Sequence, residues 1–218
     1  MGIDYNVVRK YKDRIRIFFI IYFFGEDYNE SKYSDCCKVL NTEVKIQKID
    51  FLLRNPDYLA YQLIDLMDRS GVNREEIKNI VKEIFRCEEP EIRRLEMERF
   101  FFGAYEDIDE VIVFLKSFGF IRYESERDTR LRTIKKKYYL TNKAKNKMED
   151  NLNNIPALQW YVRRCELIKK YFGDYSGSEL KSLQYQIEEY RDTVYKEYIH
   201  SIQEKVRDMY YKEFGEVL

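Results

Sequence analysis

The sequence predicts a mainly α (α+β) fold, and three observations support this prediction. Prolines and glycines are few, three and eight in 218 residues, so long regular elements are expected. Residues 107–118 place apolar side chains at helical spacing. Two stretches rich in aromatic and β-branched residues follow, at 120–123 and 134–140, and such stretches are typical of strands. A helix and a pair of strands are therefore expected in the centre of the chain.

The ends of these central elements are marked by residues with specific backbone roles. Asp107 is a suitable N-cap, and Glu110 three residues later completes a capping box. Gly119 follows the last helical turn, where glycine readily takes the left-handed conformation. Thr141 is expected to cap a further helix. Helix, glycine, strand, basic turn, strand and helix is the order of a winged helix-turn-helix, so we expect that architecture here, with flanking helices.

The remainder of the first 172 residues also indicates helices. Residues 9–24 are interpreted as a helix, although a buried strand also fits so short an apolar run. Pro156 is placed where proline is tolerated, at the start of a helix. Further helices are expected at 35–54, at 57–68, after an N-cap at Asn73, at 91–102 and at 156–172. The helix at 91–102 would be the first of the helix-turn-helix pair.

From Ser178 the sequence predicts one long C-terminal helix that continues nearly to Phe214. Its first apolar residues are spaced three, four, three and four, which is a short heptad seam. A helix of about 35 residues would span about 50 Å, more than a domain of this size can cover. We therefore predict an interface with a second chain at Leu180, Leu183, Ile187, Tyr190, Val194 and Tyr198. The expected domains are a helical and winged-helix region over 1–154 and a helical interaction region over 155–218.

Composition limits the class of protein. Basic and acidic residues number 39 each, so a generic polyanion binder is excluded as a description of the whole chain. The four cysteines include no Cys-x-x-Cys, which suggests neither a zinc site nor a disulfide framework. Reduced thiols in a cytoplasmic protein fit this usage. The apolar run at 15–24 is about half as long as a bilayer requires, so no membrane contact is expected.

No catalytic, cofactor or metal site is expected from the sequence. His200 is the only histidine and has no neighbouring nucleophile, so we interpret it as a surface or interface residue. The sequence has no phosphate-binding loop, dinucleotide fingerprint or nucleophile elbow. Carboxylates are abundant, but none lies in an apolar, strand-end context suited to acid–base catalysis. The sequence therefore predicts a protein that is not an enzyme.

Charge is unevenly distributed around the predicted hairpin. Residues 127–147 include nine basic residues and one acid, whereas residues 88–110 include nine acids and three basic residues. A basic wing could straddle the phosphates of double-stranded DNA or enter a minor groove. Two alternatives remain: a solvated hairpin that protects an edge strand, and a contact with an acidic protein. The candidate DNA-binding residues are Arg127, Arg130, Arg132, Lys135, Lys136 and Lys137.

The presumed recognition helix argues against sequence-specific DNA reading. Glu106, Asp107, Asp109 and Glu110 lie at its N-terminal end, which normally meets the bases. Their carboxylates would be repelled by the phosphate backbone. We therefore expect contact with the DNA backbone rather than with base edges.

Several segments together carry a family resemblance. They are residues 48–56 (Lys-Ile-Asp-Phe-Leu-Leu-Arg-Asn-Pro), residues 114–121 (Phe-Leu-Lys-Ser-Phe-Gly-Phe-Ile), residues 138–141 (Tyr-Tyr-Leu-Thr) with Ala144, and Trp160. Over residues 35–165 the chain resembles the middle component of ABC-type three-component, Lamassu-like anti-phage defence systems. The resemblance implies a winged-helix accessory subunit that bridges an SMC-like ATPase and an effector nuclease. It supplies no catalytic residues and favours a hetero-oligomer over a homodimer.

A second function also fits the pattern. A winged-helix transcriptional regulator would place a wing and a dimerising C-terminal helix much as predicted here. Specific binding to its own promoter would favour the regulator, and a neighbouring gene for a coiled-coil ATPase would favour the accessory subunit.

Overall fold

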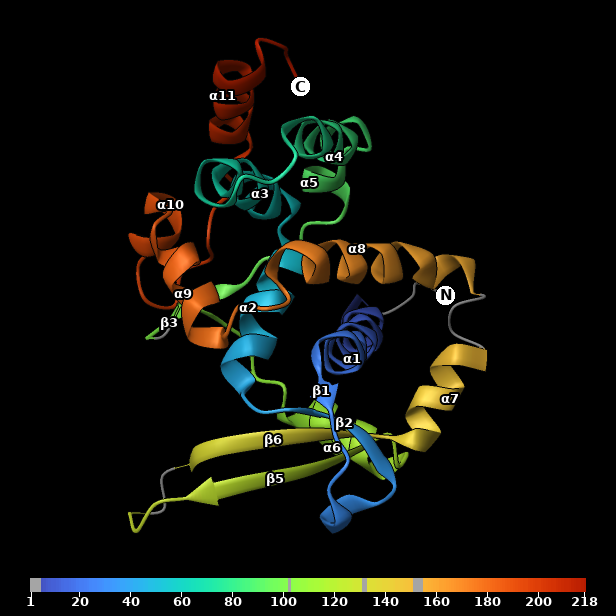
Figure 1. The fold of residues 1–218 in the computed structure, drawn as a ribbon. Helices are drawn as coiled ribbons and strands as arrows, with labels where there is room; N and C mark the ends of the chain where they lie inside the picture. Colours follow the sequence, from blue (N-terminus) through green and yellow to red (C-terminus); the bar gives the residue numbers. More distant parts are fainter. Residues whose placement is uncertain (1–4, 102, 131–132, 151–154) are drawn as a thin grey trace. The chain divides into compact units, whose positions relative to one another are not determined.

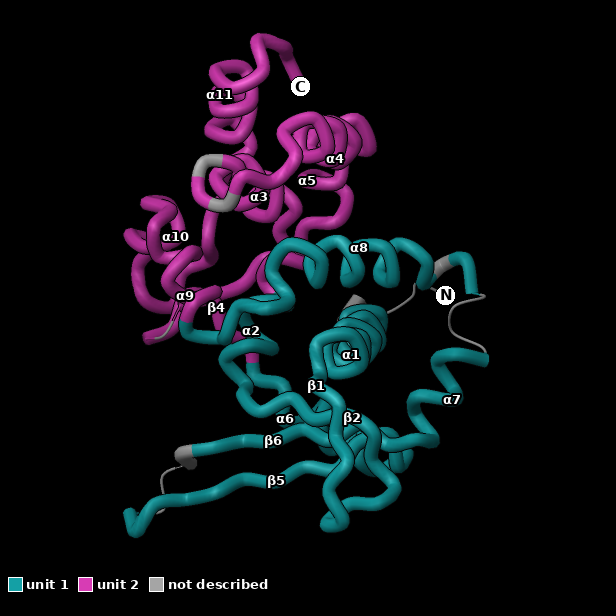
Figure 2. Tube along the Cα trace, viewed as in Figure 1, with its two compact units in different colours: residues 1–50, 107–178 teal, residues 51–106, 179–218 magenta. Residues whose placement is uncertain are grey.

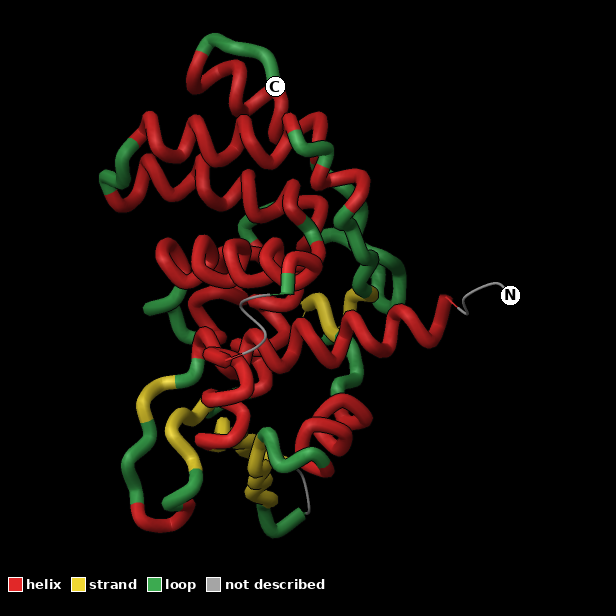
Figure 3. Tube along the Cα trace, turned by 90° about the vertical axis from the view of Figure 1, so that its right-hand side faces the viewer, coloured by secondary structure: helices red, strands yellow, loops and turns green. Residues whose placement is uncertain are grey.

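The computed structural model describes residues 5–101, 103–130, 133–150 and 155–218 (Figure 1). Helices make up most of the trace, with short antiparallel strands between them, so the predicted α+β class is confirmed (Figure 3). The chain divides into two compact units, each built from two separate segments (Figure 2). Unit 1 contains residues 1–50 and 107–178, and unit 2 contains residues 51–106 and 179–218. The boundary expected between 154 and 155 therefore lies inside unit 1.

Unit 1 contains a four-stranded antiparallel sheet in the order β1-β2-β6-β5. Its strands are β1 (Glu26–Asp27), β2 (Cys36–Leu40), β5 (Ile121–Arg127) and β6 (Thr133–Thr141). The two predicted strands of the hairpin are confirmed and are longer than expected. The start of the predicted helix at 35–54 is wrong, because β2 occupies it. Val39 and Leu40 lie opposite Tyr139 and Tyr138 of β6, and this pairing outweighs the helical spacing.

Five helices of unit 1 surround this sheet or follow it along the chain. They are α1 (Tyr5–Phe24), the first two turns of α2 (Glu43–Arg54), α6 (Asp109–Ser117), α7 (Asn142–Asp150) and α8 (Pro156–Phe172). The helices predicted at 9–24 and 156–172 are confirmed. α1 is central, since it packs against α6, α8, β2 and β6. Its Phe18 ring lies 5.7 Å from the ring of Phe120, between centroids.

The predicted helix ends are correct at two of three positions. Gly119 has φ +68°, the left-handed conformation expected after the central helix. The Thr141 hydroxyl accepts a hydrogen bond of 3.2 Å from the backbone N–H of Ala144, as an N-cap does. The capping box at Asp107 is wrong, because Ile108 occupies the N-cap position. The Asp107 carboxylate instead accepts a 2.8 Å bond from the N–H of Asp109.

A buried ion pair connects α1 to the part of α2 that belongs to unit 1. Nε of Arg16 lies 2.7 Å from Oδ1 of Asp50, and both side chains are almost fully buried. Asp13 provides a second carboxylate at 2.7 Å from Arg16 Nη2. Burial alone would lower the pKa of Arg16, but the two carboxylates outweigh it and raise the pKa. The guanidinium is therefore held charged inside unit 1.

Unit 2 is helical apart from one short β-hairpin. Its elements are the end of α2, α3 (Pro56–Ser70), α4 (Arg74–Arg86), α5 (Glu89–Ile92), β3 (Glu98–Phe100), β4 (Gly103–Tyr105), most of α9 (Gly177–Tyr185), α10 (Glu188–Arg191) and α11 (Gln203–Phe214). Asn73 caps α4 as predicted, since its side chain accepts bonds from Glu75 N and Glu76 N. Phe51, Tyr58 and Tyr190 form an aromatic core, with ring centroids 4.8 Å and 5.0 Å from Phe51 to the two tyrosines.

The helix predicted at 91–102 does not form. α5 ends at Ile92, and β3 then pairs with β4. On its other side β3 meets a distant stretch: Arg99 N donates to Glu197 O at 2.9 Å, and Ile199 N donates to Met97 O at 3.0 Å. These bonds between segments about 100 residues apart leave no place for a helix here. The prediction of two consecutive helices before the hairpin, at 91–102 and 107–118, is therefore wrong, because the first of them is absent.

The single long C-terminal helix is also wrong. The chain beyond Ser178 forms three separate helices, α9, α10 and α11, within unit 2. Lys196 has φ +68°, a left-handed conformation that a continuous helix excludes. The residues that follow pair with β3 instead. Within the described residues, none of the helices combines the length and apolar content that a bilayer crossing needs.

Candidate functional site

The hairpin of β5 and β6 is the part of unit 1 that extends furthest from its helices α1, α6 and α7 (Figure 1). Its base is apolar, with Ile121 opposite Leu140 and Tyr123 opposite Tyr138. Tyr138 and Leu140 are buried in unit 1. Because side chains alternate between the two faces of a strand, most charged residues of β5 and β6 share one face, whereas Lys136 lies on the face of Tyr138 and Leu140. A rigid base thus presents a charged end to solvent.

Three of the six predicted DNA-binding residues are exposed near the tip. Arg127 ends β5, Arg130 lies in the turn, and Lys135 is on β6. The backbone N–H of Arg130 donates 2.9 Å to the carboxylate of Asp128, which shapes the turn. Arg132 lies outside the described residues. The structure therefore brings together Arg127, Arg130 and Lys135 as exposed cations at one end of the hairpin.

Lys136 and Lys137 are placed differently from the tip residues. Lys136 is partly buried and forms ion pairs with Glu43, at the start of α2, and with Asp109 at 3.6 Å. Burial would lower the pKa of Lys136, but the hydrogen bond and charge of Glu43 outweigh it and raise the pKa. Lys137 lies opposite Glu124 in the strand register. The charge of Lys136 is therefore balanced within the unit, whereas Lys137 is placed beside an acid by register alone.

The acids at the start of α6 also have basic neighbours. Asp109 faces Lys136, and Glu110 lies 3.3 Å from Lys10 of α1. These carboxylates are 73% and 86% exposed, so each pair is screened by water and is weak. The predicted repulsion between this helix end and phosphates is therefore reduced, although it is not removed.

A second polar cluster, which the sequence did not predict, lies around Glu124 on the charged face of the hairpin. Glu124 of β5 accepts hydrogen bonds from the hydroxyls of Tyr33 (2.6 Å) and Tyr139 (2.9 Å) and pairs with Lys32. The hydrogen bond from Lys32, then that from Tyr33, lowers the pKa of Glu124 to about 2. Tyr33 and Lys32 belong to the 3₁₀ turn Ser31–Tyr33. The cluster fixes that turn against the middle of β5.

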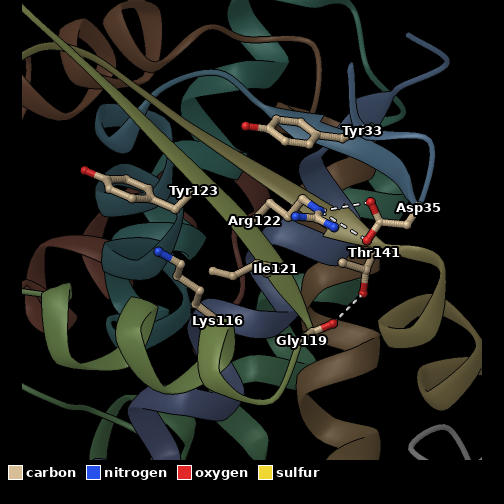
Figure 4. Close-up of a pocket in the computed structure, with 8 residues that line it drawn as sticks. All are labelled: Tyr33, Asp35, Lys116, Gly119, Ile121, Arg122, Tyr123 and Thr141. Carbon is tan, nitrogen blue, oxygen red and sulfur yellow. Dashed lines mark hydrogen bonds and ion pairs between the residues drawn. The ribbon is translucent and has the colours of Figure 1, made fainter. Parts of the chain in front are cut away.

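A half-open pocket of about 410 Å³ lies beside this cluster, along the start of β5 (Figure 4). On one wall Arg122 Nε donates to both carboxylate oxygens of Asp35, at 2.9 and 3.1 Å, and its guanidinium lies 5.3 Å from the Tyr33 ring centre. The pairing with Arg122 lowers the pKa of Asp35. Lys116 and Tyr123 lie on the opposite side in Figure 4. The full lining is Tyr33, Asp35, Lys116, Gly119, Ile121, Arg122, Tyr123 and Thr141.

The end of the pocket nearest α6 is lined by Lys116, and Lys143 lies close to it. Lys116, on the last turn of α6, is exposed and forms no ion pair with a described residue. Lys143 donates 2.7 Å to the carbonyl oxygen of Phe118 and lies next to Gly119. At the floor, the Thr141 hydroxyl donates 2.8 Å to the carbonyl of Gly119. This end of the pocket is therefore electropositive, while its far wall is a neutralised Arg–Asp pair.

The residues predicted to form a partner interface do not make one seam. Leu180, Ile187 and Tyr190 are at most 1% exposed and belong to the interior of unit 2. Leu183 is partly buried. Val194 and Tyr198 are 60% and 46% exposed. The seam is wrong for its three buried members, whereas contact of Val194 and Tyr198 with a partner stays a prediction.

The remaining chemistry-bearing side chains are dispersed. His200 is exposed, and its backbone carbonyl accepts a 3.0 Å bond from the Tyr58 hydroxyl. The four cysteines are free thiols, and burial raises the pKa of Cys36 to about 11. Within the described residues no group of three or more His, Cys, Asp or Glu side chains is arranged to hold a metal ion. Comparison with protein-family models, with curated proteins and with solved structures gives no match.

Proposed function

We propose that unit 1 is a winged-helix-type module whose helices are separated in sequence by an insertion. Along the chain its elements are α1, β2, the start of α2, α6, β5 and β6, and the three main strands are ordered β2-β6-β5. In this interpretation α6 is the helix before the wing, β5 and β6 form the wing, and residues 51–106 of unit 2 are inserted before α6. The insertion supports the proposal because it explains why the helix expected at 91–102 is missing.

The function that the geometry supports best is that of a non-catalytic adaptor that contacts the backbone of double-stranded DNA. One observation carries it: Arg127 and Arg130 are exposed at the hairpin tip with Lys135, which lies opposite Glu126, while Lys136 nearer the base is paired with Glu43. Cations at the end of a projecting hairpin suit phosphate contact, which requires charge but no fixed base geometry.

A salt-dependent binding measurement tests the DNA contact. We expect Arg127→Glu with Arg130→Glu to weaken binding of a 30-base-pair duplex by about tenfold or more. The slope of log affinity against log salt should fall by about 1.8, since each lost phosphate contact removes about 0.9. Arg163→Glu with Lys212→Glu, at two exposed positions away from the hairpin, is the control with the same change in net charge. Equal affinity and slope in both double variants would show that the tip does not bind DNA.

We further propose that the adaptor acts as the accessory subunit that the family resemblance implies, between an SMC-like ATPase and an effector nuclease in anti-phage defence. Exposed Val194 and Tyr198 are the part of the predicted interface that is still available to a partner. Co-expression with an SMC-like ATPase encoded beside it, followed by size-exclusion chromatography, tests this proposal. A protein that elutes alone, with no ATPase in its peak, would contradict it.

The transcriptional regulator has less support. Its dimerising helix was the long C-terminal helix, and three residues of that seam are buried in unit 2. The outer face of α6 presents Asp109, Glu110, Val113 and Lys116, so only Lys116 is of the type that reads guanine edges. We therefore expect equal affinity for promoter and random duplexes, measured by competition.

A further inference from the structure

The outer edge of β5 is an open strand edge. β5 is the last strand of its sheet, and no described strand pairs with its outer side. The backbone N–H of Thr141 donates to Phe120 O at 3.1 Å, so this opposed pair is hydrogen-bonded. Bonded and non-bonded pairs alternate along an antiparallel ladder. The backbone N–H and C=O groups of Arg122, Glu124 and Glu126 therefore point toward β6. Those of the odd-numbered residues of β5 point outward, away from the sheet.

Ile121, Tyr123 and Ser125 direct their backbone groups outward, but Ile121 is only 2% exposed, so Tyr123 and Ser125 are the positions that can pair with another strand. These two positions span about 7 Å at 3.4 Å per residue, enough to pair with the middle of one short extended segment. Natural edges are commonly blocked by proline, by a bulge or by inward-pointing charge. β5 contains no proline, and its register shift lies beyond this stretch, between Glu126 and Arg127. The accessible edge from Tyr123 to Ser125 therefore contains neither a proline nor a bulge.

The half-open pocket follows the first part of this edge. Ile121 and Tyr123 belong to its lining, together with the Tyr33 ring on one side and Lys116 on the other. The charged side chains that could shield the edge are already engaged: Arg122 with Asp35, and Glu124 with Lys32 and two tyrosines. The pocket therefore provides side walls for a strand that pairs with the edge.

Charge selects the chemistry of that strand. Lys116 is exposed without an ion pair to a described residue, and Lys143 flanks the same end of the pocket. The one acid in the lining, Asp35, is neutralised by Arg122. We propose that the open edge of β5 binds an extended acidic segment of a partner protein, which adds as a further strand with its carboxylates toward Lys116. This site is separate from the hairpin tip and does not depend on DNA contact.

Peptide binding to the full-length protein tests the proposal. The probes are two matched pools of N-acetylated, C-amidated ten-residue peptides that alternate Val, Ile or Thr with either Glu and Asp or Lys and Arg. We expect acidic peptides to be selected, to bind at least tenfold more tightly than basic counterparts, and to shift the amide NMR signals of Tyr123 and Ser125. Equal recovery from both pools, or no recovery from the acidic pool, would overturn the proposal.

Backbone pairing is tested by removing one outward donor. Ser125→Pro deletes the N–H of an exposed edge residue and should weaken the selected peptide at least tenfold, whereas Ser125→Ala should bind as the wild type does. Because the proline variant could fail to fold, the same test is made on the peptide. Methylation of alternate peptide nitrogens should abolish binding in one register and spare it in the other. Unchanged binding by both methylated peptides would exclude strand addition.

Further tests examine the role of the Lys116 charge and the identity of the molecule that binds the edge. Lys116→Glu should reverse the preference between acidic and basic peptides. Arg127→Glu with Arg130→Glu should leave peptide binding intact, so failure of the DNA proposal and failure of this one are distinguishable. If duplex DNA displaces the peptide and shifts the same amides, the edge binds nucleic acid and the proposal is wrong. A concentration-dependent dimer that Ser125→Pro abolishes and Ser125→Ala retains would assign the edge to a second copy.

Discussion

Each unit contains one carboxylate that is buried and that joins segments distant in sequence, and the two differ in what they bind. In unit 1, Asp50 pairs with the buried guanidinium of Arg16, 34 residues away. In unit 2, Asp57 accepts bonds from the Ile202 N–H (2.8 Å) and the Ser201 hydroxyl (2.7 Å), with Arg94 at a longer 3.4 Å. Asp50 balances the positive charge of Arg16, whereas Asp57 mainly accepts hydrogen bonds from uncharged donors.

The difference determines what remains when the carboxylate is lost. Removing Asp50 leaves a guanidinium that is 2% exposed without its buried counter-charge, and only the more exposed Asp13 still pairs with it. Removing Asp57 leaves a backbone N–H and a hydroxyl, and Arg94 is 14% exposed and can turn toward water. A stranded charge costs more than an unsatisfied neutral donor. The burial of a carboxylate therefore does not by itself indicate how much it stabilises the fold, because that depends on whether its partners are charged or neutral.

The largest effect is expected for Asp50→Asn. We expect the free energy of unfolding to fall by about 3–5 kcal/mol, because the variant keeps the shape but leaves Arg16 charged and buried. Urea unfolding followed by circular dichroism measures it. Arg16→Met with Asp50→Leu should recover most of that loss, because neither charge remains. A double variant less stable than Asp50→Asn would contradict this account.

A smaller effect is expected for Asp57→Asn. The amide oxygen can still accept from Ile202 or Ser201, so we expect a loss of about 1–3 kcal/mol. Hydrogen exchange should show faster exchange at Ile202 and its neighbours at the start of α11, with α1 unchanged. If Asp57→Asn costs as much as Asp50→Asn under the same conditions, the contrast between charge balance and neutral donors fails.

The smallest effect is expected at the surface, for Glu124. Its pKa is lowered to about 2 from 4.5, so its bonds stabilise the fold above about pH 4.5 and are lost as the pH falls toward 2. Glu124→Gln should cost about 1 kcal/mol at neutral pH, because its main ion pair is exposed to solvent. The stability difference between wild type and variant should shrink from pH 4.5 to pH 2. A constant difference would show that the carboxylate is not linked to folding.

The sequence predicted elements whose signals are local and missed those that depend on distant partners. The α1 run, the Asn73 cap, Gly119, the hairpin strands and the Pro156 start follow from spacing and capping residues, and all are present. β2, β3 and the strand-like stretch after Lys196 are stabilised by pairing with residues about 100 positions away. No window of neighbouring residues contains that information.

The residues of the candidate site likewise include some that local sequence predicts and others that depend on distant partners. Arg127, Arg130 and Lys135 were found because charge can be counted along the chain, and they are exposed. Lys136 was counted with them, but its balance by Glu43 depends on the start of α2, 93 residues earlier. The cluster around Glu124 and the open edge beside Lys116 depend on which strand is outermost, which the sequence does not reveal.

The interleaving of the two units has a consequence for how this protein is made. Unit 1 requires α8, and unit 2 requires α11, so neither is complete when the ribosome has synthesised only the first half of the chain. A fragment that stops at residue 154 would lack part of both bodies, with the apolar faces that α8 and α11 normally cover left in water. Exposed apolar faces of this kind would favour aggregation of such a fragment.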